Sequence, residues 1–177
     1  TGESLFEALS LLSQDCILET LSLLEQGNCP RRAQDEEKAS HCSMIVKQDG
    51  FVNWNKPAVE IEAMVRAFNP WPAAVSILPN GKSFKIWKAR VIRQKEKDFQ
   101  SFSEIKEDWL FAHLPESLSE EEKEVFRKKD GIGKMYRNKE NNRLLLSTGE
   151  GYLEILEIQV EGKKRLDTPA FLLGFGG

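Results

Sequence analysis

The first apolar pattern of the chain is helical. Leucines and one isoleucine recur at helical spacing, at Leu5, Leu9, Leu12, Ile17, Leu21 and Leu24. This pattern predicts helix over residues 4–26. We expect a break near Ser13 and Gln14, with Asp15 as the cap of a second helix. Gly27 should end the helical region, because glycine commonly follows the last helical turn.

The next apolar stripe follows a polar stretch, residues 28–50, which has no clear period and which we interpret as a linker. The stripe itself is spaced i, i+3, i+4 and i+7, at Ile61, Met64, Val65 and Phe68. It predicts a second helix with one buried face. Asn55 is its candidate cap and Pro57 falls in its first turn. Pro70 should end it, because the residue before a proline is pushed out of the helical region.

A corner of two prolines around a tryptophan comes next, formed by Asn69, Pro70, Trp71 and Pro72. Each proline fixes its own φ, so the backbone is stiff on both sides of the indole. We expect this corner to be structural. It should bury Trp71 in the core and turn the chain into the first strand.

The remaining apolar patterns are short and typical of strands. The candidates are residues 73–78, 84–92, 133–137, 143–148 and 152–160. Turn residues separate them, and the alternation is irregular around Trp87, as a β-bulge would produce. A charged segment at about 94–130 predicts a helical insertion, and a short closing helix should be capped by Asp167 or Thr168. We therefore expect an α+β, mainly β fold, a small open antiparallel β-barrel of OB type with flanking helices.

Composition adds limits to this picture. The 177 residues carry a formal charge of −3, with 40% hydrophobic and 30% charged residues, which is ordinary for a globular protein. No apolar run is long enough for a membrane span, so we expect no membrane partner. Three cysteines without a disulfide framework, and no signal peptide, favour a cytoplasmic location. Because the chain starts at Thr1 rather than Met, we expect a trimmed product or a fragment.

The residues give little indication of catalysis. The chain has two histidines, His41 and His113, and neither belongs to a catalytic motif. The spacing of Cys29, His41 and Cys42 matches no zinc pattern, so we expect no metal site. We therefore assign no catalytic residue.

Basic residues are the stronger signal. They cluster in the 82–93 strand region and after the last long strand, and the candidates for nucleic-acid binding are Lys82, Lys85, Lys88, Arg90, Lys163, Lys164 and Arg165. Trp87 and Phe84 could stack bases. The alternative is that these lysines cover an ordinary surface while the aromatic residues fill the core.

Two segments resemble a known family. They are VNWNKPAVEIEAMVRAFNPWPAAVSILPNGKSFKIWKARV and STGEGYLEILEIQVEGKKRLDTPAFLLGF. Both are similar to the C-terminal domain of the methionyl-tRNA formyltransferase family. The resemblance implies three regions. Residues 1–27 would be the last helices of a truncated N-terminal catalytic domain, residues 28–50 the linker, and residues 51–177 the C-terminal β-barrel domain.

The resemblance also implies a function. The full-length family enzyme transfers a formyl group from 10-formyltetrahydrofolate to the amino group of methionine on initiator tRNA. We expect this chain to bind initiator methionyl-tRNA and no cofactor. Alone it should be inactive, and it should be a monomer. Two alternatives remain open. One is the same module in another formyl-handling enzyme, such as a sugar-nucleotide formyltransferase or a formyltetrahydrofolate hydrolase/dehydrogenase. The other is a purely structural or dimerising domain.

Overall fold

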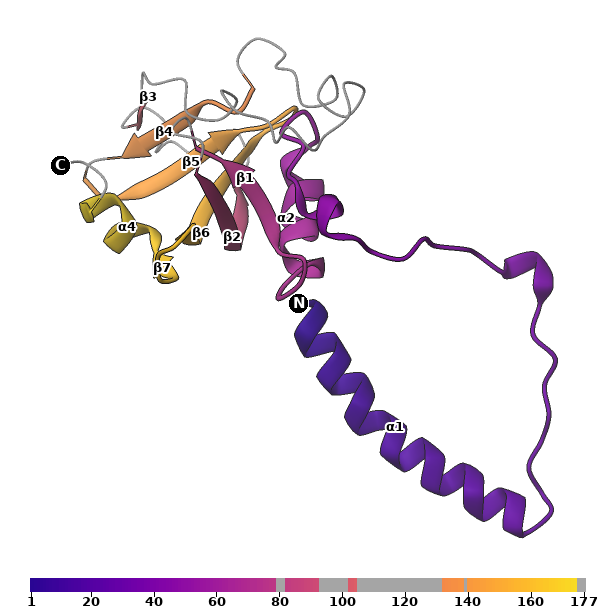
Figure 1. Cartoon of the computed structure of the whole chain (residues 1–177). Helices are drawn as coiled ribbons and strands as arrows, with labels where there is room; N and C mark the ends of the chain where they lie inside the picture. Colours follow the sequence, from indigo (N-terminus) through magenta and orange to yellow (C-terminus); the bar gives the residue numbers. More distant parts are fainter. Residues whose placement is uncertain (79–81, 93–101, 105–131, 139, 175–177) are drawn as a thin grey trace.

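The computed structural model describes residues 1–78, 82–92, 102–104, 132–138 and 140–174 (Figure 1). Its strands are β1 (Ala74–Ile77), β2 (Ser83–Ile92), β3 (Phe102–Glu104), β4 (Met135–Asn138), β5 (Arg143–Ser147), β6 (Tyr152–Val160) and β7 (Leu166–Asp167). Its helices are α1 (Gly2–Glu25), η1 (Glu36–Lys38), η2 (Lys47–Gly50), α2 (Ala58–Ala67) and α4 (Thr168–Gly174).

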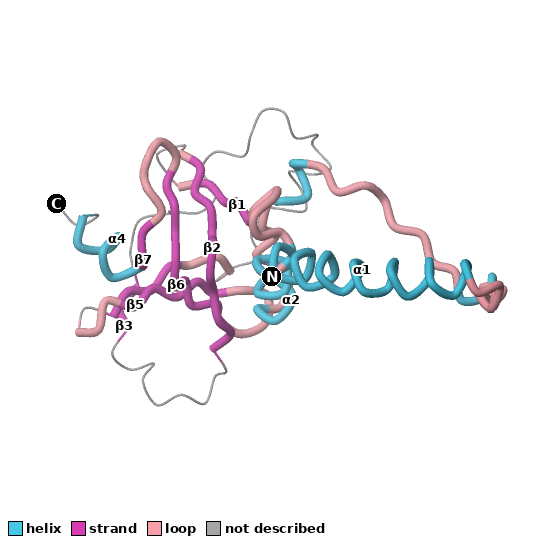
Figure 2. The backbone as a smooth tube through the Cα atoms, turned by 90° about the horizontal axis from the view of Figure 1, so that it is seen from below, coloured by secondary structure: helices cyan, strands magenta, loops and turns pink. Residues whose placement is uncertain are grey.

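The strands form one antiparallel sheet. Their order is β1-β2-β6-β5-β4-β3, and β7 pairs with β6. This confirms the predicted antiparallel, β-rich fold with flanking helices. The described ladder runs from β1 at one end to β3 at the other, with no pairing between those two strands among the described residues. In both views α2 and α4 lie on opposite sides of the long strands (Figures 1 and 2).

The core is one cluster of buried side chains that come from the sheet, from α2 and from α4. Ile61 and Val65 of α2 are buried, which confirms the predicted apolar stripe. The other large, fully buried side chains of this cluster are Trp54, Leu78, Phe84, Ile86, Leu144, Leu146, Leu153, Ile155 and Ile158. Leu145 is also fully buried, but it pairs with Glu154 and lies outside the cluster. Leu144, Ile155 and Ala89 occupy paired positions on adjacent strands, so the same face of β5, β6 and β2 turns inward.

α1 is one continuous helix, and the predicted break at Ser13 and Gln14 is wrong. Ser13 instead bonds within the helix, its hydroxyl donating to the carbonyl of Ser10 at 2.8 Å. Thr1 caps the helix in a reciprocal pair with Ser4. No residue of α1 is buried, and the helix projects away from the sheet (Figure 1).

The segment after α1 has little regular structure. It contains η1 and η2, and residues 30–49 are exposed. η2 returns the chain to the domain, where Phe51 bridges to Val75 of β1 and Val52 donates a backbone hydrogen bond to the same residue at 2.9 Å.

The corner after α2 differs from the prediction in one respect. Trp71 is 60% exposed, so the expectation that it is buried in the core is wrong. Prolines fix the backbone, but they do not determine which way the indole between them points. Both prolyl bonds of the corner are cis. Among the described tryptophans the buried one is Trp54, which is 1% exposed and donates from Nε1 to the Ser76 hydroxyl at 3.1 Å.

Two element boundaries also need correction. α2 begins after Pro57, which occupies the cap position without a side-chain bond, so Asn55 is not the cap. Residues 102–104 form a strand rather than part of a helix, and the rest of the predicted insertion lies outside the described residues. At the closing helix the prediction holds, since the Asp167 carboxylate accepts a bond from the Ala170 amide at 2.8 Å.

Candidate nucleic-acid interface

The pairing of β2 with β6 places three predicted basic residues in a row. Lys85 lies opposite Gln159, Lys88 opposite Glu157 and Arg90 opposite Glu154. The register is irregular between Ile86 and Lys88, which confirms the bulge predicted near Trp87. All three basic side chains are exposed, because strand alternation directs them away from the core.

Trp87 is the centre of the first basic group, the Trp87 cluster, which consists of Lys85, Trp87, Gln159 and Arg165. The Lys85 ammonium lies 5.6 Å from the indole centroid and the Arg165 guanidinium 4.9 Å from it. Both distances suit cation–π attraction. The indole Nε1 donates to Gln159 Oε1 at 3.0 Å, so the ring has a fixed orientation. The cluster therefore presents two cations at defined positions on a partly exposed aromatic platform.

Two of the predicted arginines have acidic partners. Arg165 forms an ion pair with Glu157, and Arg90 forms one with Glu154, with its Nε 2.5 Å from Oε2. Arg90 is still 54% exposed at its side chain. Its guanidinium can reach solvent, but its charge is partly compensated.

Glu154 is almost fully buried and is shared by two arginines. Arg143 donates to it from Nε at 2.8 Å and from Nη2 at 3.0 Å, in addition to the bond from Arg90. Burial alone would raise the pKa of Glu154. The hydrogen bonds and charges of Arg143 and Arg90 outweigh burial, so the pKa is lowered below its ordinary value. This triad holds β2, β5 and β6 together on the outer face of the sheet.

The second basic group surrounds a hollow of about 380 Å³, which we call the lysine hollow. Three lysines belong to it, Lys82, Lys163 and Lys164. Its other lining residues are Leu78, Ile158, Val160, Leu166, Ala170, Phe171 and Gly174. Lys82 precedes β2, and the other two lysines lie in the turn between β6 and β7.

The turn after β6 is held to β2. The Glu161 amide donates to the Ser83 carbonyl at 2.9 Å, and the Glu161 carboxylate accepts from the Ser83 amide at 3.2 Å and hydroxyl at 3.0 Å. The two bonds from Ser83 to the carboxylate, with smaller contributions from the charges of Lys82 and Lys47, lower the pKa of Glu161. These bonds between Ser83 and Glu161 thus fix the position of the turn and its lysines relative to Lys82.

The predicted basic residues therefore divide between two places, one on each face of β6 and both reached by the β6–β7 turn. Lys85 and Arg165 belong to the Trp87 cluster, and Lys88 and Arg90 lie further along β2. The other three lysines line the lysine hollow. Sequence reasoning missed Gln159 and Arg143. Gln159 carries no charge or motif, and Arg143 gains its role only from the β5–β6 pairing.

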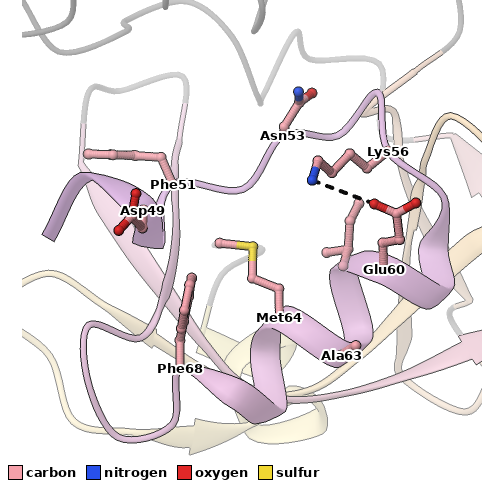
Figure 3. Close-up of a pocket in the computed structure, with 9 residues that line it drawn as sticks. Asp49, Phe51, Asn53, Lys56, Glu60, Ala63, Met64 and Phe68 are labelled. Atoms are coloured by element: carbon pink, nitrogen blue, oxygen red, sulfur yellow. Dashed lines mark ion pairs between the residues drawn. The ribbon is translucent and has the colours of Figure 1, made fainter. Parts of the chain in front are cut away.

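A further hollow, of about 390 Å³, lies between α2 and the residues around η2 (Figure 3). Phe51, Met64 and Phe68 contribute apolar walls, and Lys56 pairs with Glu60 at 3.5 Å on one side. Asp49 lies on the other side (Figure 3). With two carboxylates against one lysine, this hollow does not suit phosphate.

Other chemistry is not evident in the described part of the chain. Its histidines, cysteines and acidic residues form no group of three or more that could hold a metal ion. None of its described helices combines the length and apolarity needed to cross a membrane.

Comparison with known proteins identifies the class. The family described as "Formyl transferase, C-terminal domain" matches residues 44–176. The chain therefore belongs to this family. A variant of HypX from Aquifex aeolicus has a similar fold, with a TM-score of 0.52, 16% identity and 91% of this chain covered, but only 23% of that chain.

Particular relatives extend the similarity over nearly the whole chain. A protein of Agathobacter rectalis named methionyl-tRNA formyltransferase is 38% identical over 174 residues, which is 98% of this chain and 45% of the relative. One of the same name from Lachnospira eligens is 32% identical over 174 residues, 98% of this chain and 46% of the relative. The chain thus spans about half the length of these curated relatives.

Proposed function

We propose that this chain is the C-terminal part of a methionyl-tRNA formyltransferase and that it contributes tRNA binding rather than chemistry. The relatives with this name match across 98% of the chain, and the family match covers residues 44–176. The single observation that favours a binding role is the arrangement on β2 and the β6–β7 turn. There, two basic groups lie along β2 and the turn, and one of them holds two cations over the aromatic ring of Trp87.

In the full-length enzyme the chain would hold the substrate for a reaction that takes place elsewhere. The amino group of methionine on initiator tRNA would attack the formyl carbon of 10-formyltetrahydrofolate. The new C–N bond forms as the bond to the folate nitrogen breaks, and tetrahydrofolate leaves with a proton. The residues that promote these steps would lie in the half of the relatives that this chain does not cover. The chain alone should bind no formyl-folate and show no transfer.

The three regions of the chain would have different roles in the full-length enzyme. Residues 1–27 would belong to the catalytic domain, since the large apolar side chains of α1, such as Phe6 at 75% and Leu18 at 66%, are exposed and suited to packing against it. Residues 28–50 would be the linker. Residues 51–177 would form an OB-like open barrel that binds tRNA as a cytoplasmic monomer.

Contacts between these basic residues and the phosphates of the tRNA would provide the binding. Lys85 and Lys88 are exposed on the outer face of β2, and Arg165 is held over Trp87. Each cation that meets a phosphate releases a condensed counterion, so affinity should fall steeply as salt rises.

The test is a titration of initiator tRNA with the chain at several salt concentrations. We expect a linear fall of log affinity with log salt. Lys85→Ala and Lys88→Ala should each reduce the slope by about 1. Lys38→Ala is the matched control, because Lys38 is exposed in the linker and paired with Asp35 at 2.8 Å. Affinity that does not change with salt would contradict the proposal.

A further inference from the structure

The lysine hollow differs from a simple phosphate-binding surface. Its floor and walls are apolar, formed by residues such as Ile158, Val160 and Leu166, while its cations stand around them. No carboxylate is among its described lining residues. A site that only followed a phosphate backbone would need cations on a polar surface and would gain nothing from an apolar hollow. The hollow therefore suits a ligand with an apolar part and an attached anion.

We propose that the lysine hollow takes one unstacked nucleotide of an RNA strand, with its base against the apolar wall and its phosphates on Lys163 and Lys164. The proposal rests on the proposed tRNA-binding function and deepens it. The volume of about 380 Å³ falls within the range of small-molecule sites. Single-stranded nucleic acid is commonly bound in this way, by a positive groove combined with apolar or aromatic contacts to the bases.

Two acidic residues that adjoin the lining residues in the sequence, Glu161 and Asp167, are engaged in hydrogen bonds. The Glu161 carboxylate accepts two hydrogen bonds from Ser83, and the Asp167 carboxylate accepts one from the Ala170 amide. Their charges reduce the positive potential but do not line the hollow. The lining that the structure describes thus contains lysines and no carboxylate, which favours an anionic ligand.

The lysine hollow and the Trp87 cluster are joined through one side chain. The Gln159 amide accepts from the Trp87 indole at 3.0 Å and donates to the Lys163 carbonyl at 3.0 Å. Arg165, two residues after Lys163, returns to the indole. Ile158 and Val160 of the hollow point to the opposite face of β6 from Gln159, so for a ligand only the turn residues Lys163, Lys164 and Arg165 connect the two groups. This row of three consecutive cations around the turn favours a long polyanion such as RNA over an unconnected small anion.

The experiment fills the hollow without removing a charge. Ala170 is exposed and lines the hollow, so Ala170→Phe should occupy the space of the base. Leu173→Phe is the matched control, because Leu173 is 75% exposed on the same helix and does not line the hollow. Binding of the whole chain is measured by fluorescence anisotropy to a single-stranded RNA oligonucleotide, a blunt fully paired RNA duplex and initiator tRNA.

We expect Ala170→Phe to weaken binding of the single-stranded RNA about tenfold, which is typical for the loss of one base-stacking contact. Binding of the duplex should weaken less than about twofold. The salt slope should stay unchanged, because no phosphate contact is lost. Lys163→Ala combined with Lys164→Ala should weaken binding of both RNAs and lower the slope. Leu166→Ser, which removes part of the apolar wall, is a second variant should Ala170→Phe fold poorly.

Two results overturn the inference while the proposed function stands. One is that both hollow variants bind single-stranded RNA as the parent chain does, while the lysine variants bind weakly. The other is that oleate binds the parent chain and not Ala170→Phe, with RNA binding unchanged, which would assign the hollow to an apolar carboxylate. A parent chain that binds neither tRNA nor either RNA overturns the proposed function and this inference together.

Discussion

The side-chain amide of Asn69 donates a hydrogen bond to the main-chain carbonyl oxygen of Trp87, at 3.1 Å. The carbonyl of Asn69 in turn accepts from the Glu3 amide at 3.1 Å. The proline corner is thus connected to the start of α1 and to the bulge of β2. Because the bulge positions the Trp87 cluster, the corner acts on the binding surface through Asn69 rather than through its own tryptophan.

Asn69→Ala should therefore destabilise the chain and loosen the bulge. Loss of the bond leaves the Trp87 carbonyl without this donor in a half-buried place, at a cost of about 1 kcal/mol. Urea unfolding followed by far-UV circular dichroism measures the change. Asn28→Ala is the control, because Asn28 is exposed after α1 and should change stability by less than about 0.5 kcal/mol. Equal stability of the two variants would remove this role for Asn69.

The two tryptophans Trp54 and Trp71 should respond very differently to truncation. Trp54→Ala should cost about 3–5 kcal/mol, because the ring is fully buried and its Nε1 bond to Ser76 is also lost. Trp71→Ala should cost less than about 1 kcal/mol, because that ring is largely exposed. Thermal unfolding of both variants measures this. A larger loss for Trp71 than for Trp54 would contradict the burial of the two rings.

The elements that the sequence predicted well are those whose signal is local and periodic. The stripe containing Ile61 and Val65 predicted the buried face of α2, and the interrupted alternation at Trp87 predicted the bulge. The corner was recognised as rigid, but the direction of Trp71 depends on packing that no periodicity encodes. At residues 102–104, the charged composition of the segment suggested helix, whereas pairing with β4 makes a strand.

The candidate site was predictable as a set of residues but not as an arrangement. The lysines and arginines could be named from their clusters in the sequence. Their division into two groups depends on which residues the pairing of β2 with β6 places opposite them. Local sequence patterns do not reveal pairing between strands that are far apart in the chain. Glu154 shows this most clearly, because its position within an ordinary strand pattern gave no sign that Arg90 and Arg143 would both bind it.

Gly149 should not tolerate a side chain. A Cβ at this position would lie 1.9 Å from the carbonyl oxygen of Asn55. The Gly149 amide also donates to the carbonyls of Trp54 at 2.8 Å and Lys56 at 3.1 Å, so the two segments cannot separate without losing bonds. Gly149→Ala should cost about 2–3 kcal/mol, measured by urea unfolding.

Gly174→Ala is the control for this steric argument. A Cβ at Gly174 meets nothing within 4 Å, so the variant should keep the parent stability to within about 0.5 kcal/mol. If Gly149→Ala were as stable as Gly174→Ala, the close approach of Gly149 to the Asn55 carbonyl would be wrong.

Stability should depend on pH through Glu154. Its pKa is lowered in the folded chain, so its folded value lies below the ordinary value of 4.5 expected in the unfolded chain. The unfolded chain therefore takes up a proton first as pH falls. The stabilisation by Glu154 is fully present above about pH 4.5 and is lost progressively as pH falls through the lowered folded pKa.

Glu154→Gln isolates this contribution. At neutral pH it should cost about 2–3 kcal/mol, because Arg143, 16% exposed at its side chain, loses its charged acceptor, while the more exposed Arg90 loses less. The stability difference from the parent should shrink as pH falls below the ordinary carboxyl pKa, because a protonated glutamate resembles glutamine. Urea unfolding at a series of pH values measures it, with Glu140→Gln at an exposed glutamate as control. A difference that stays constant down to the acid limit would show that Glu154 is not held ionised by the two arginines.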